Sequence, residues 1–446
     1  GMYIALPRCL PNMSEPSMTD AELALLGHLI GDGCTLQRSA LQYITGDSGL
    51  AERVTNLARE VFGSAVRPHT EQVQRATDHH PRYYVFLTSS EHLTHGKRNP
   101  VAAWLDALGV FNRRSYEKCV PEKVFTQSLT GIACFLRHLW STDGCIHLDQ
   151  GQKYYVNIYY ASSSYQLAKD VQSLLLRLGI NATLARCPRG KKGRDQYHVV
   201  VSGRSDILTF LTHIGGLGQS KVAHHALIDA YLDGRKANTN RDIVPAAIWE
   251  MFAVPAMQAA GIPTRQMQAA LGNAYCGTAL YKQNVSRERA ARLARVVSSE
   301  PLEKLAQSDV YWDEIVSILP DEEIDVYDLT VAGSHNFVAD NIIVHNSIEN
   351  DADVVMFIYR EEVYNTATER KNQADLIVAK QRNGPTGQAI LYFDQAQSRF
   401  ANLETAYDPE SGEIAFAEEG APEDGRREDW PEEDVETGDE GDDENR

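Results

Sequence analysis

The sequence predicts a multidomain protein that combines α/β and α+β architecture. Three observations support this prediction. An apolar helical segment ending in Asp-Gly occurs twice, at residues 25–33 and 135–144, and strand-like alternation follows each copy. Two short predicted strands end near residue 347. The segment after them contains further predicted strands separated by turns. With 446 residues, the chain is long enough for about two to four domains.

Composition predicts a cytoplasmic protein without a disulfide framework. The seven cysteines are odd in number and form no Cys-x-x-Cys pair, which also argues against a zinc knuckle. No apolar run approaches the roughly 20 residues of a membrane helix, and no signal peptide is recognisable, so we expect no membrane partner. Much of the net charge of −18 lies in residues 423–444. The remainder is closer to neutral and is compatible with a nucleic-acid partner.

Residues 1–17 contain a predicted strand, Met2–Pro7, and a linker rich in Pro and Ser. The first repeated helix then begins at a capping box, Thr19-Asp20-Ala21-Glu22. It ends at Gly33, for which we predict a left-handed cap. Asp32 is unfavourable there, because a carboxylate in the last turn faces the negative end of the helix dipole at a cost of about 0.3–1 kcal/mol. Asp143 occupies the same place in the second copy.

Asp32 and Asp143 are therefore candidate metal ligands. Two carboxylates brought together repel and raise each other's pKa unless a divalent cation lies between them. Mg²⁺ leaves coordination positions for water and phosphate oxygens, which suits hydrolysis of a phosphodiester. For either helix alone, a buried amphipathic helix with an exposed Asp is the simpler interpretation, but the repetition favours a paired Mg²⁺ site.

The repeated pattern resembles the double-motif LAGLIDADG homing endonucleases over residues 18–235. Lys118-Cys119-Val120-Pro121 is similar to the Lys-x-Ile-Pro motif of that family, and Leu174–Ile180 is similar to its second-repeat helix. The resemblance implies αββαββα repeats, a double-stranded DNA partner, and Lys118 near the scissile phosphate. His138 departs from the family, which usually has a small residue there. The alternative is a catalytically degenerate insert that binds DNA without cutting or splicing.

Strands are predicted at Tyr83–Leu87 and Tyr197–Val201, beside a basic stretch at Arg186–Arg194. Such charge runs are often solvated loops, but next to a repeated sheet they favour phosphate contacts. Residues 236–310 are predicted to be helical, with helix starts at Ile262–Gln266 and Val285–Arg289. A helix-turn-helix and a plain helical spacer both remain open for this region.

Residues 326–347 contain the groups needed for asparagine cyclisation. The Asn346 side-chain amide can attack its own backbone carbonyl and break the next peptide bond if the leaving amine is protonated. His345 is the neighbouring side chain suited to that proton transfer. The Ser347 hydroxyl can accept an acyl group. The alternative is an ordinary β-hairpin around the turn Ala332-Gly333-Ser334.

This stretch resembles the C-terminal splicing motif of inteins. The resemblance implies that His335 assists the cyclisation and that Asn346 is the last intein residue. It places residues 311–346 in a β-rich splicing (Hint) region and residues 1–17 at the last strand of the N-terminal splicing half. We therefore expect a missing N-terminal half as a partner.

Residues 347–404 resemble the C-terminal end of the RecA-like α/β motor of DnaB-type replicative helicases. The strands 354–359 and 374–379 and the segment 380–385 carry this resemblance. It implies that Lys380 and Arg382 reach the γ-phosphate of nucleotide bound by a neighbouring subunit of a hexamer; a basic hairpin turn is the alternative. The sequence has no Walker A loop, so we expect ATP as a ligand only of the complete helicase. Residues 405–446 are acidic and predicted to be disordered.

Overall fold

The structure is a computed structural model that describes residues 2–11, 14–74, 81–94, 97–190, 193–235, 242–320, 322, 329, 331, 336–345, 354–364, 368, 370–381, 384–385, 387–394 and 399–402. The chain divides into two compact units, Gly1–His345 and Asn346–Arg446. The mixed α/β character expected from the sequence is confirmed, because helices and antiparallel sheets alternate along the first unit.

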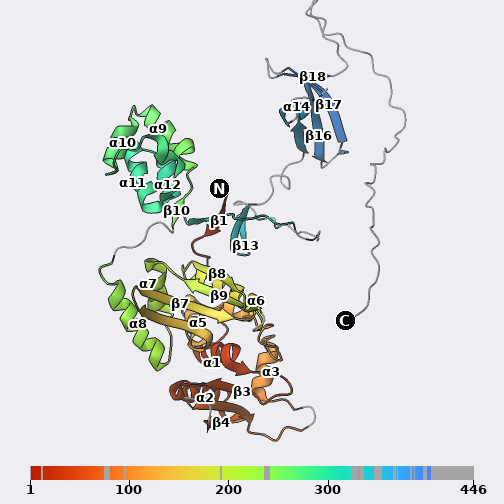
Figure 1. Ribbon diagram of the computed structural model, residues 1–446. Coiled ribbons are helices and arrows are strands. Elements are labelled where there is room, and N and C mark those ends of the chain that lie inside the picture. The colour runs from red at the N-terminus through yellow and green to blue at the C-terminus, as the bar shows by residue number, and fades with distance from the viewer. Residues whose placement is uncertain are drawn as a thin grey trace, which may run out of the picture. The chain divides into compact units, whose positions relative to one another are not determined.

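The first unit contains two copies of one αββαββ arrangement (Figure 1). The first copy consists of α1 (Asp20–Asp32), β2 (Gly33–Cys34), β3 (Gln42–Thr45), α2 (Ser48–Phe62), β4 (Val66–Val73) and β5 (Arg82–Ser89). The second consists of α5 (Leu129–Asp143), β6 (Gly144–Gln150), β7 (Tyr154–Ser162), α6 (Tyr165–Arg177), β8 (Ala182–Cys187) and β9 (Gln196–Val201). Both sheets have the same antiparallel order, β2-β3-β5-β4 and β6-β7-β9-β8. The internal repeat predicted from the sequence is therefore a repeat of topology as well.

Shorter helices complete this region. After the first copy come α3 (Pro100–Ala107) and α4 (Glu122–Phe125), and after the second come α7 (Arg204–His213) and α8 (Gln219–Leu232). One continuous hydrophobic core links both repeats, with Trp140, Tyr43, Tyr160, Phe135 and Phe210 among its largest fully buried side chains. The two repeats thus fold around shared buried surface rather than as separate domains.

Helix α1 begins as predicted and ends differently. The capping box is present, because Glu22 N–H donates to Thr19 Oγ1 at 3.2 Å and the Glu22 carboxylate accepts from Thr19 N–H at 2.8 Å. The predicted left-handed cap at Gly33 is wrong, since its φ is −78° and its ψ is 136°. Glycine is required there for space: a Cβ at Gly33 would lie 2.3 Å from Leu29 O. Gly144 ends α5 in the same extended conformation.

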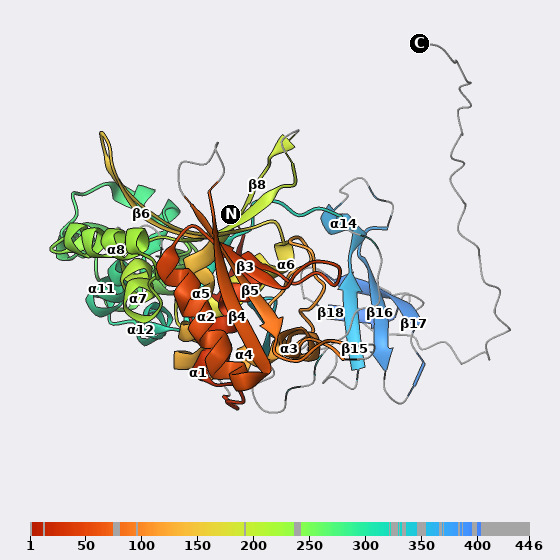
Figure 2. The same ribbon diagram turned by 90° about the horizontal axis from the view of Figure 1, so that it is seen from below.

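Helices α1 and α5 lie side by side (Figures 1 and 2), and glycine lets their backbones approach closely. A Cβ built on Gly27 would lie 2.7 Å from Phe135 O and 2.9 Å from Leu139 N. A Cβ on Gly31 would overlap the Thr142 side chain. The contact therefore consists of backbone against backbone, which only glycine permits at Gly27.

A second, smaller core holds the helical region that follows. This region contains β10 (Ile243–Val244), the π-helical turn η4 (Trp249–Ala253), α9 (Val254–Ala259), α10 (Thr264–Ala270), η5 (Gly277–Lys282), β11 (Val285–Ser286), α11 (Arg287–Val297) and α12 (Glu300–Gln307). Trp249, Met257, Met267, Leu293 and Leu302 are among its buried residues. The two helix starts predicted from the sequence are confirmed, at Thr264 and Arg287. Figure 1 shows α9, α10, α11 and α12 gathered in one bundle.

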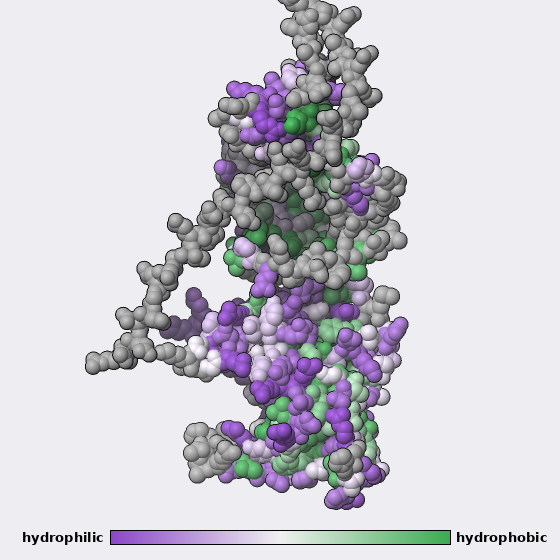
Figure 3. Space-filling view, turned by 90° about the vertical axis from the view of Figure 1, so that its right-hand side faces the viewer, coloured by the Kyte–Doolittle hydropathy of each residue, from purple (hydrophilic) through white to green (hydrophobic). Residues whose placement is uncertain are grey.

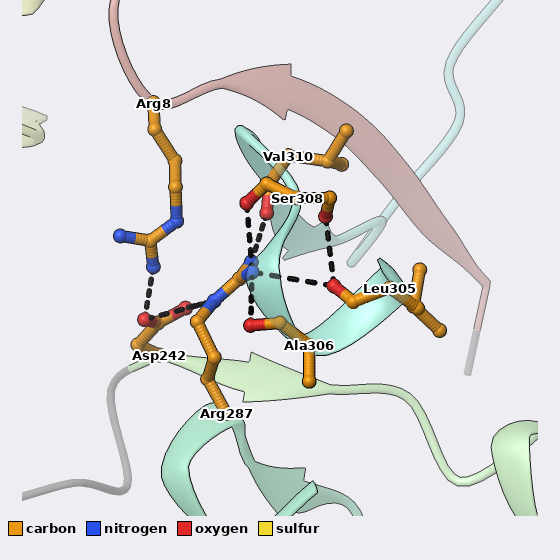
Figure 4. Close-up of polar contacts among 7 residues, drawn as sticks. All are labelled: Arg8, Asp242, Arg287, Leu305, Ala306, Ser308 and Val310. Atoms are coloured by element: carbon orange, nitrogen blue, oxygen red, sulfur yellow. Dashed lines mark hydrogen bonds and ion pairs between the residues drawn. The ribbon is translucent and has the colours of Figure 1, made fainter. Parts of the chain in front are cut away.

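Arg287 forms hydrogen bonds at one end of this bundle (Figure 4). Its guanidinium donates to Ala306 O at 2.9 Å and Ser308 O at 2.8 Å, so it caps the carbonyl end of α12. It also forms an ion pair with Asp242 at 3.2 Å, and Asp242 pairs in turn with Arg8. A cation at the C-terminal end of a helix is favoured by the helix dipole.

Two small antiparallel ribbons accompany the bundle. The strand predicted near the start is confirmed as β1 (Tyr3–Pro7), which pairs with β12 (Val310–Glu314). The hairpin near residue 340 consists of β13 (Asn336–Ala339) and β14 (Ile342–His345). The turn lies at Asp340 and Asn341, with φ of 54° and 64°, as in a type I′ hairpin. The predicted turn at 332–334 lies outside the described residues, and the turn at Asp340 and Asn341 was not predicted.

The second unit contains one antiparallel sheet of order β15-β16-β17-β18. Its elements are β15 (Val354–Tyr359), α14 (Glu361–Tyr364), β16 (Gln373–Gln381), β17 (Gly387–Asp394) and β18 (Arg399–Asn402). The two strands predicted here are confirmed. Residues 405–446, predicted to be disordered, lie outside the described residues.

Figure 3 shows hydrophilic residues over much of the face that it displays. Among the described helices, none combines the length and the apolar character that a membrane span requires.

The close contact of α1 and α5 predicts the effect of adding one methyl group. Gly27→Ala should destabilise the protein by about 1–3 kcal/mol, because the new Cβ overlaps backbone atoms that cannot rotate away. Gly46→Ala is the matched control, since nothing lies within 4 Å of the Cβ that it would add. Thermal unfolding of both variants measures the difference. Equal melting temperatures would contradict the packing described for α1 and α5.

Candidate functional site

The two predicted acids end the two paired helices. Asp32 is the last residue of α1 and Asp143 the last residue of α5. Because α1 and α5 pack against each other, both carboxylates lie at the same end of the helix pair. They are close enough for the charge of Asp143 to raise the pKa of Asp32. The structure therefore brings together the two residues that the sequence repeat singled out.

Each helix end also holds a lysine. Lys118 Nζ donates to Gly31 O at 2.7 Å and to Gly33 O at 3.3 Å. Lys221, at the start of α8, donates to Ser141 O at 2.7 Å, Trp140 O at 3.0 Å and Thr142 O at 3.2 Å. The two lysines thus bind the free carbonyl groups that end α1 and α5. This pairing offsets the unfavourable position of an acid at the negative end of each helix.

Lys221 was not predicted from the sequence. The signal that could have found it is the internal repeat, because a lysine downstream of the second Asp-Gly occupies the role of Lys118 downstream of the first. The surrounding residues, Gly-Gln-Ser-Lys at 218–221, do not resemble Glu-Lys-Cys-Val at 117–120. Lys221 and Lys118 have the same role, but their neighbouring residues differ. The family motif around Lys118 therefore gave no signal at Lys221.

Burial and neighbouring charges shift the pKa values of the two acids and the two lysines of the site. Burial, with the nearby Asp143 as the second cause, raises the pKa of Asp32 to about 7. The loss of water around the Asp143 carboxyl raises its pKa as well, although part of the side chain remains exposed to solvent. Burial lowers the pKa of Lys118 and of Lys221, and the two carboxylates oppose that shift. Two acids and two bases therefore share one partly desolvated site.

An open cleft of about 730 Å³ begins at this site. Asp32 and Lys221 line it together with Ile44, Thr45, Gly46, Asp47, Leu50, Pro81, Arg82, Ser141, Thr142, Leu217, Gly218 and Ser220. Because both repeats contribute to the lining, the cleft can receive a ligand that spans them. Asp143 and Lys118 lie outside the cleft lining but act on Asp32 electrostatically.

The backbone around Lys118 is held by the second repeat. Ser164 Oγ, at the start of α6, donates to Lys118 O at 2.6 Å. Asp170 accepts from Val120 N–H at 2.8 Å, and its other oxygen accepts from Gln166 at 2.8 Å. Asp170 and Ser164 were not predicted from the sequence, since buried anchors of this kind leave no local pattern. They position Lys118 rather than contact a ligand.

A divalent cation fits the residues present. After burial, the charge of Asp143 is the second cause that raises the pKa of Asp32, and a hard divalent cation between two carboxylates relieves such repulsion. Asp32 and Asp143 offer oxygen ligands, and the open cleft leaves room for water. Among the described residues, no group of three or more His, Cys, Asp and Glu could hold a metal. Any cation held here would be bound by these two carboxylates and by water.

His138 fills the position where the resembled family has a small residue. Its Nδ1 lies 2.9 Å from His28 Nε2, across the contact of α1 and α5. Burial lowers the pKa of His138 to about 4 and that of His28 well below its usual value. The two histidines are therefore neutral and hydrogen-bonded to each other. His138 packs against His28 at the position where a small residue was expected.

The predicted splicing residues are only partly described. His345 ends β14, and its backbone pairs with Asn336 in β13. His335, Asn346 and Ser347 lie outside the described residues. The structure thus describes the strand that directly precedes Asn346.

The predicted nucleotide contacts are also partly described. Lys380 is a half-buried residue of β16, opposite Val355 of β15, and Arg382 lies outside the described residues.

Two family descriptions match the chain. A LAGLIDADG-like domain matches residues 130–215, and a DnaB-like helicase C terminal domain matches residues 337–402. The first match covers the second αββαββ repeat, including Asp143. The second match covers β13 and β14 and extends through the sheet of the second unit.

Relatives cover nearly all of the chain. The replicative DNA helicase DnaB of Nostoc sp. is 53% identical over 401 residues, which are 90% of this chain and 45% of that protein. The protein of the same name from Rhodothermus marinus is 54% identical over 92% of this chain and 44% of its own length. The chain therefore spans less than half the length of these relatives.

Among solved structures, the crystal structure of I-DmoI in complex with DNA and Mn is 17% identical and covers 44% of this chain and 96% of that chain, with a TM-score of 0.30. The assignment to a family rests on the sequence similarity to the helicases and on the two domain matches. The chain belongs to the DnaB-type replicative helicases, in a form that carries a LAGLIDADG-like domain, as expected for a helicase that contains a LAGLIDADG intein.

Proposed function

We propose that residues 18–235 form an endonuclease that hydrolyses phosphodiester bonds of double-stranded DNA. The observation that supports this function best is the pairing of Asp32 and Asp143 at one end of two packed helices. Each acid belongs to one of two topologically equal repeats. A duplex also presents two equivalent strands, so a two-fold arrangement of acids suits cleavage of both.

The proposed chemistry follows from these side chains. Asp32 and Asp143 bind the cation, and a bound Mg²⁺ supplies charge neutralisation and an activated water. Lys118 and Lys221 bring positive charge to the same place, where it stabilises the extra negative charge of a phosphoryl transition state. The carbonyl groups at the helix ends hold both ammonium groups in position, so little reorganisation is needed on binding.

The two sheets are the proposed DNA-contacting surfaces. Arg186 and Arg189 lie on and after β8, where Arg186 pairs with Asp195 at 2.6 Å and Arg189 bonds Gln196. Stacked pairs, Tyr159 with His198 and His69 with Phe86, lie across neighbouring strands of the two sheets. Arginine and stacked rings at a sheet surface suit phosphate and groove contacts.

A second activity, protein splicing at residue 346, is supported by the β13–β14 hairpin. The hairpin leads directly into the segment His345-Asn346-Ser347, which has the residue types for asparagine cyclisation. In this proposal His335 and His345 move protons, Asn346 cyclises, and Ser347 starts the helicase segment. The partner is a chain or segment that supplies the N-terminal splicing half.

Residues 347–404 are then the end of the helicase motor. We assign Lys380 and Arg382 to the nucleotide of a neighbouring subunit in the assembled, ATP-dependent helicase. The competing function for residues 18–235 is DNA binding without cleavage, and the following experiments separate the two.

Removing either acid should abolish cleavage. Asp32→Asn and Asp143→Asn each delete one negative charge without changing side-chain size, and we expect Mg²⁺-dependent nicking of a plasmid carrying the uninterrupted helicase gene to fall at least about 100-fold. The assay is gel conversion of supercoiled plasmid. Glu60→Gln, on an exposed position of α2, is the charge-matched control and should cut normally. Full activity in both Asp variants would exclude the two-acid site, and no cutting by the unsubstituted chain would favour the binding-only function.

Metal binding should weaken as the pH falls. The metal site needs the carboxylate of Asp32, whose pKa is about 7 without metal, so apparent Mg²⁺ affinity should fall about tenfold per pH unit below 7. Without Mg²⁺, the raised pKa has the opposite effect on folding. The stability that protonated Asp32 contributes is complete below its unfolded pKa and is lost as pH rises through 7.

Thermal unfolding at pH 6 and pH 8, with and without Mg²⁺, tests both statements. The stabilisation by Mg²⁺ should be larger at pH 8. The neutral pair His28 and His138 weakens folding below pH 6.5, since the unfolded histidines take up protons there, so each pH profile is compared with that of Asp32→Asn. A pH-independent difference between the two profiles would disprove the raised pKa.

The splicing proposal predicts slow cleavage before Ser347. Asn346→Ala should prevent the appearance of a fragment that begins at Ser347, because alanine has no amide to attack the backbone carbonyl. Intact-mass spectrometry of stored protein detects the fragment. Asn341→Gly, in the turn of the same hairpin, is the control and should still cleave, because glycine adopts the positive φ of that position without strain. A Ser347 fragment formed equally by Asn346→Ala would point to a contaminating protease instead of cyclisation.

A further inference from the structure

Residues 243–307 form a module whose core is separate from that of the two repeats. Its buried residues gather around Trp249, Met257, Met267 and Leu293. Arg287 closes the module by binding the carbonyl end of α12 (Figure 4). A helical spacer between domains needs only a polar surface and helix propensity, whereas α9, α10, α11 and α12 all contribute buried residues to one core.

The first two helices have the connection of a helix-turn-helix. One helix runs through η4 and α9 and ends at Ala259, and α10 starts at Thr264. Four residues separate them, among them Gly261 with φ of 64°. Ile262 N–H donates to Met257 O at 2.9 Å, which closes the turn in the manner of a Schellman cap. A turn of three or four residues containing glycine is typical of the DNA-binding helix pair.

The inner face of α10 is held rigidly. Met267 and Leu271 are buried in the module core. Gln268 is fully buried, donates to Gly277 O at 2.7 Å and accepts from Cys276 N–H at 2.8 Å. Thr264 Oγ1 lies 2.8 Å from Tyr281 OH at the start of the helix. Because three contacts fix its orientation, α10 presents its outer face without further ordering on binding.

The outer face of α10 carries the residues that read base edges. Arg265, Gln266, Ala269 and Ala270 are exposed. Arginine and glutamine form bidentate hydrogen bonds with guanine and adenine in the major groove, and small alanines allow a helix to approach the bases closely. The Arg265 guanidinium lies over the exposed ring of Tyr275, 4.8 Å from its centroid, which keeps it near the helix surface.

The charge of the module agrees with a polyanionic partner. Residues 243–307 contain seven Lys and Arg against four Asp and Glu, a net charge of +3 in a chain of net charge −18. Arg289, Arg292 and Arg295 follow one another along α11 at helical spacing, and no carboxylate among the described residues forms an ion pair with them. Such arginines suit phosphate contacts.

We propose that residues 243–307 are a helix-turn-helix module that binds double-stranded DNA, with α10 in the major groove and Arg265 and Gln266 on the base edges. The proposal extends the DNA binding of residues 18–235 to a second contact on the same duplex. It rests on the proposed function only in taking double-stranded DNA as the ligand.

The test uses the full chain with Asp32→Asn, so that cutting does not interfere, and duplexes that this chain selects from a random pool. Replacing both outer residues, Arg265→Ala with Gln266→Ala, should weaken binding about tenfold or more and remove one protected segment of the hydroxyl-radical footprint. Alanine is the best helix former, so α10 should remain folded.

The control removes the same kinds of group from another helix of the module. Lys304→Ala with Gln307→Ala deletes one cation and one amide from exposed positions of α12. We expect binding within about threefold of the parent and an unchanged footprint, as for substitutions outside the base contacts. Arg265→Lys should keep most of the affinity but broaden the selected sequence under that segment, because lysine is not bidentate.

The outcomes separate this inference from the endonuclease proposal. An unchanged footprint and affinity in the Arg265→Ala, Gln266→Ala chain would overturn the inference, and so would an equal loss in the α12 control. If the unsubstituted chain fails to cut DNA while the outer residues of α10 still govern binding, the inference stands and the endonuclease function fails.

Discussion

The backbone contact between α1 and α5 is the constraint on which the first unit depends. Gly27 lies so close to Phe135 and Leu139 that no side chain fits between them. This contact fixes the two helix ends beside each other, and with them Asp32 and Asp143. The two sheets follow as outer layers, since β2 and β6 begin at the residues that end the helices. One close approach therefore places both the repeats and the candidate site.

The site is costly for folding, and its surroundings offset the cost. Two carboxylates at negative helix ends are unfavourable twice, once from the helix dipoles and once from each other. Lys118 and Lys221 compensate by binding the helix-end carbonyls and by their charge near both acids. Burial and the nearby Asp143 nevertheless raise the pKa of Asp32 to about 7. The contacts of Lys118 and Lys221 thus stabilise the fold and also belong to the proposed chemistry.

Local patterns in the sequence predicted the elements well, because their causes are local. The capping box at Thr19 and Glu22 needs only neighbouring residues, and it formed as predicted. The repeated Asp-Gly ends predicted the pairing of Asp32 with Asp143, since internal repetition implies two-fold geometry. Gly33 was assigned the wrong conformation, because its cause is the nearby Leu29 carbonyl rather than a left-handed turn.

What the sequence could not predict depends on contacts between distant residues. Lys221 reaches α5 from a helix about 80 residues later, and Asp170 holds the segment of Lys118 from another repeat. The hairpin turn at Asp340 and Asn341 was not predicted either, because the turn was expected at Ala332-Gly333-Ser334. Both turn residues have positive φ, which Asp and Asn tolerate better than most residues.

The two hydrophobic cores of the first unit suggest how one chain could combine different activities. A mutation in the core around Trp249 disturbs few contacts of the core around Trp140, because the two sets of buried residues are distinct. Beside the second core lie polar contacts, among them the ion pairs of Asp242 with Arg8 and with Arg287. Polar contacts of this kind contribute less to stability than apolar burial. The helical module can therefore change or be lost with modest effect on the paired acids, whereas the glycine contact that places those acids tolerates almost no substitution.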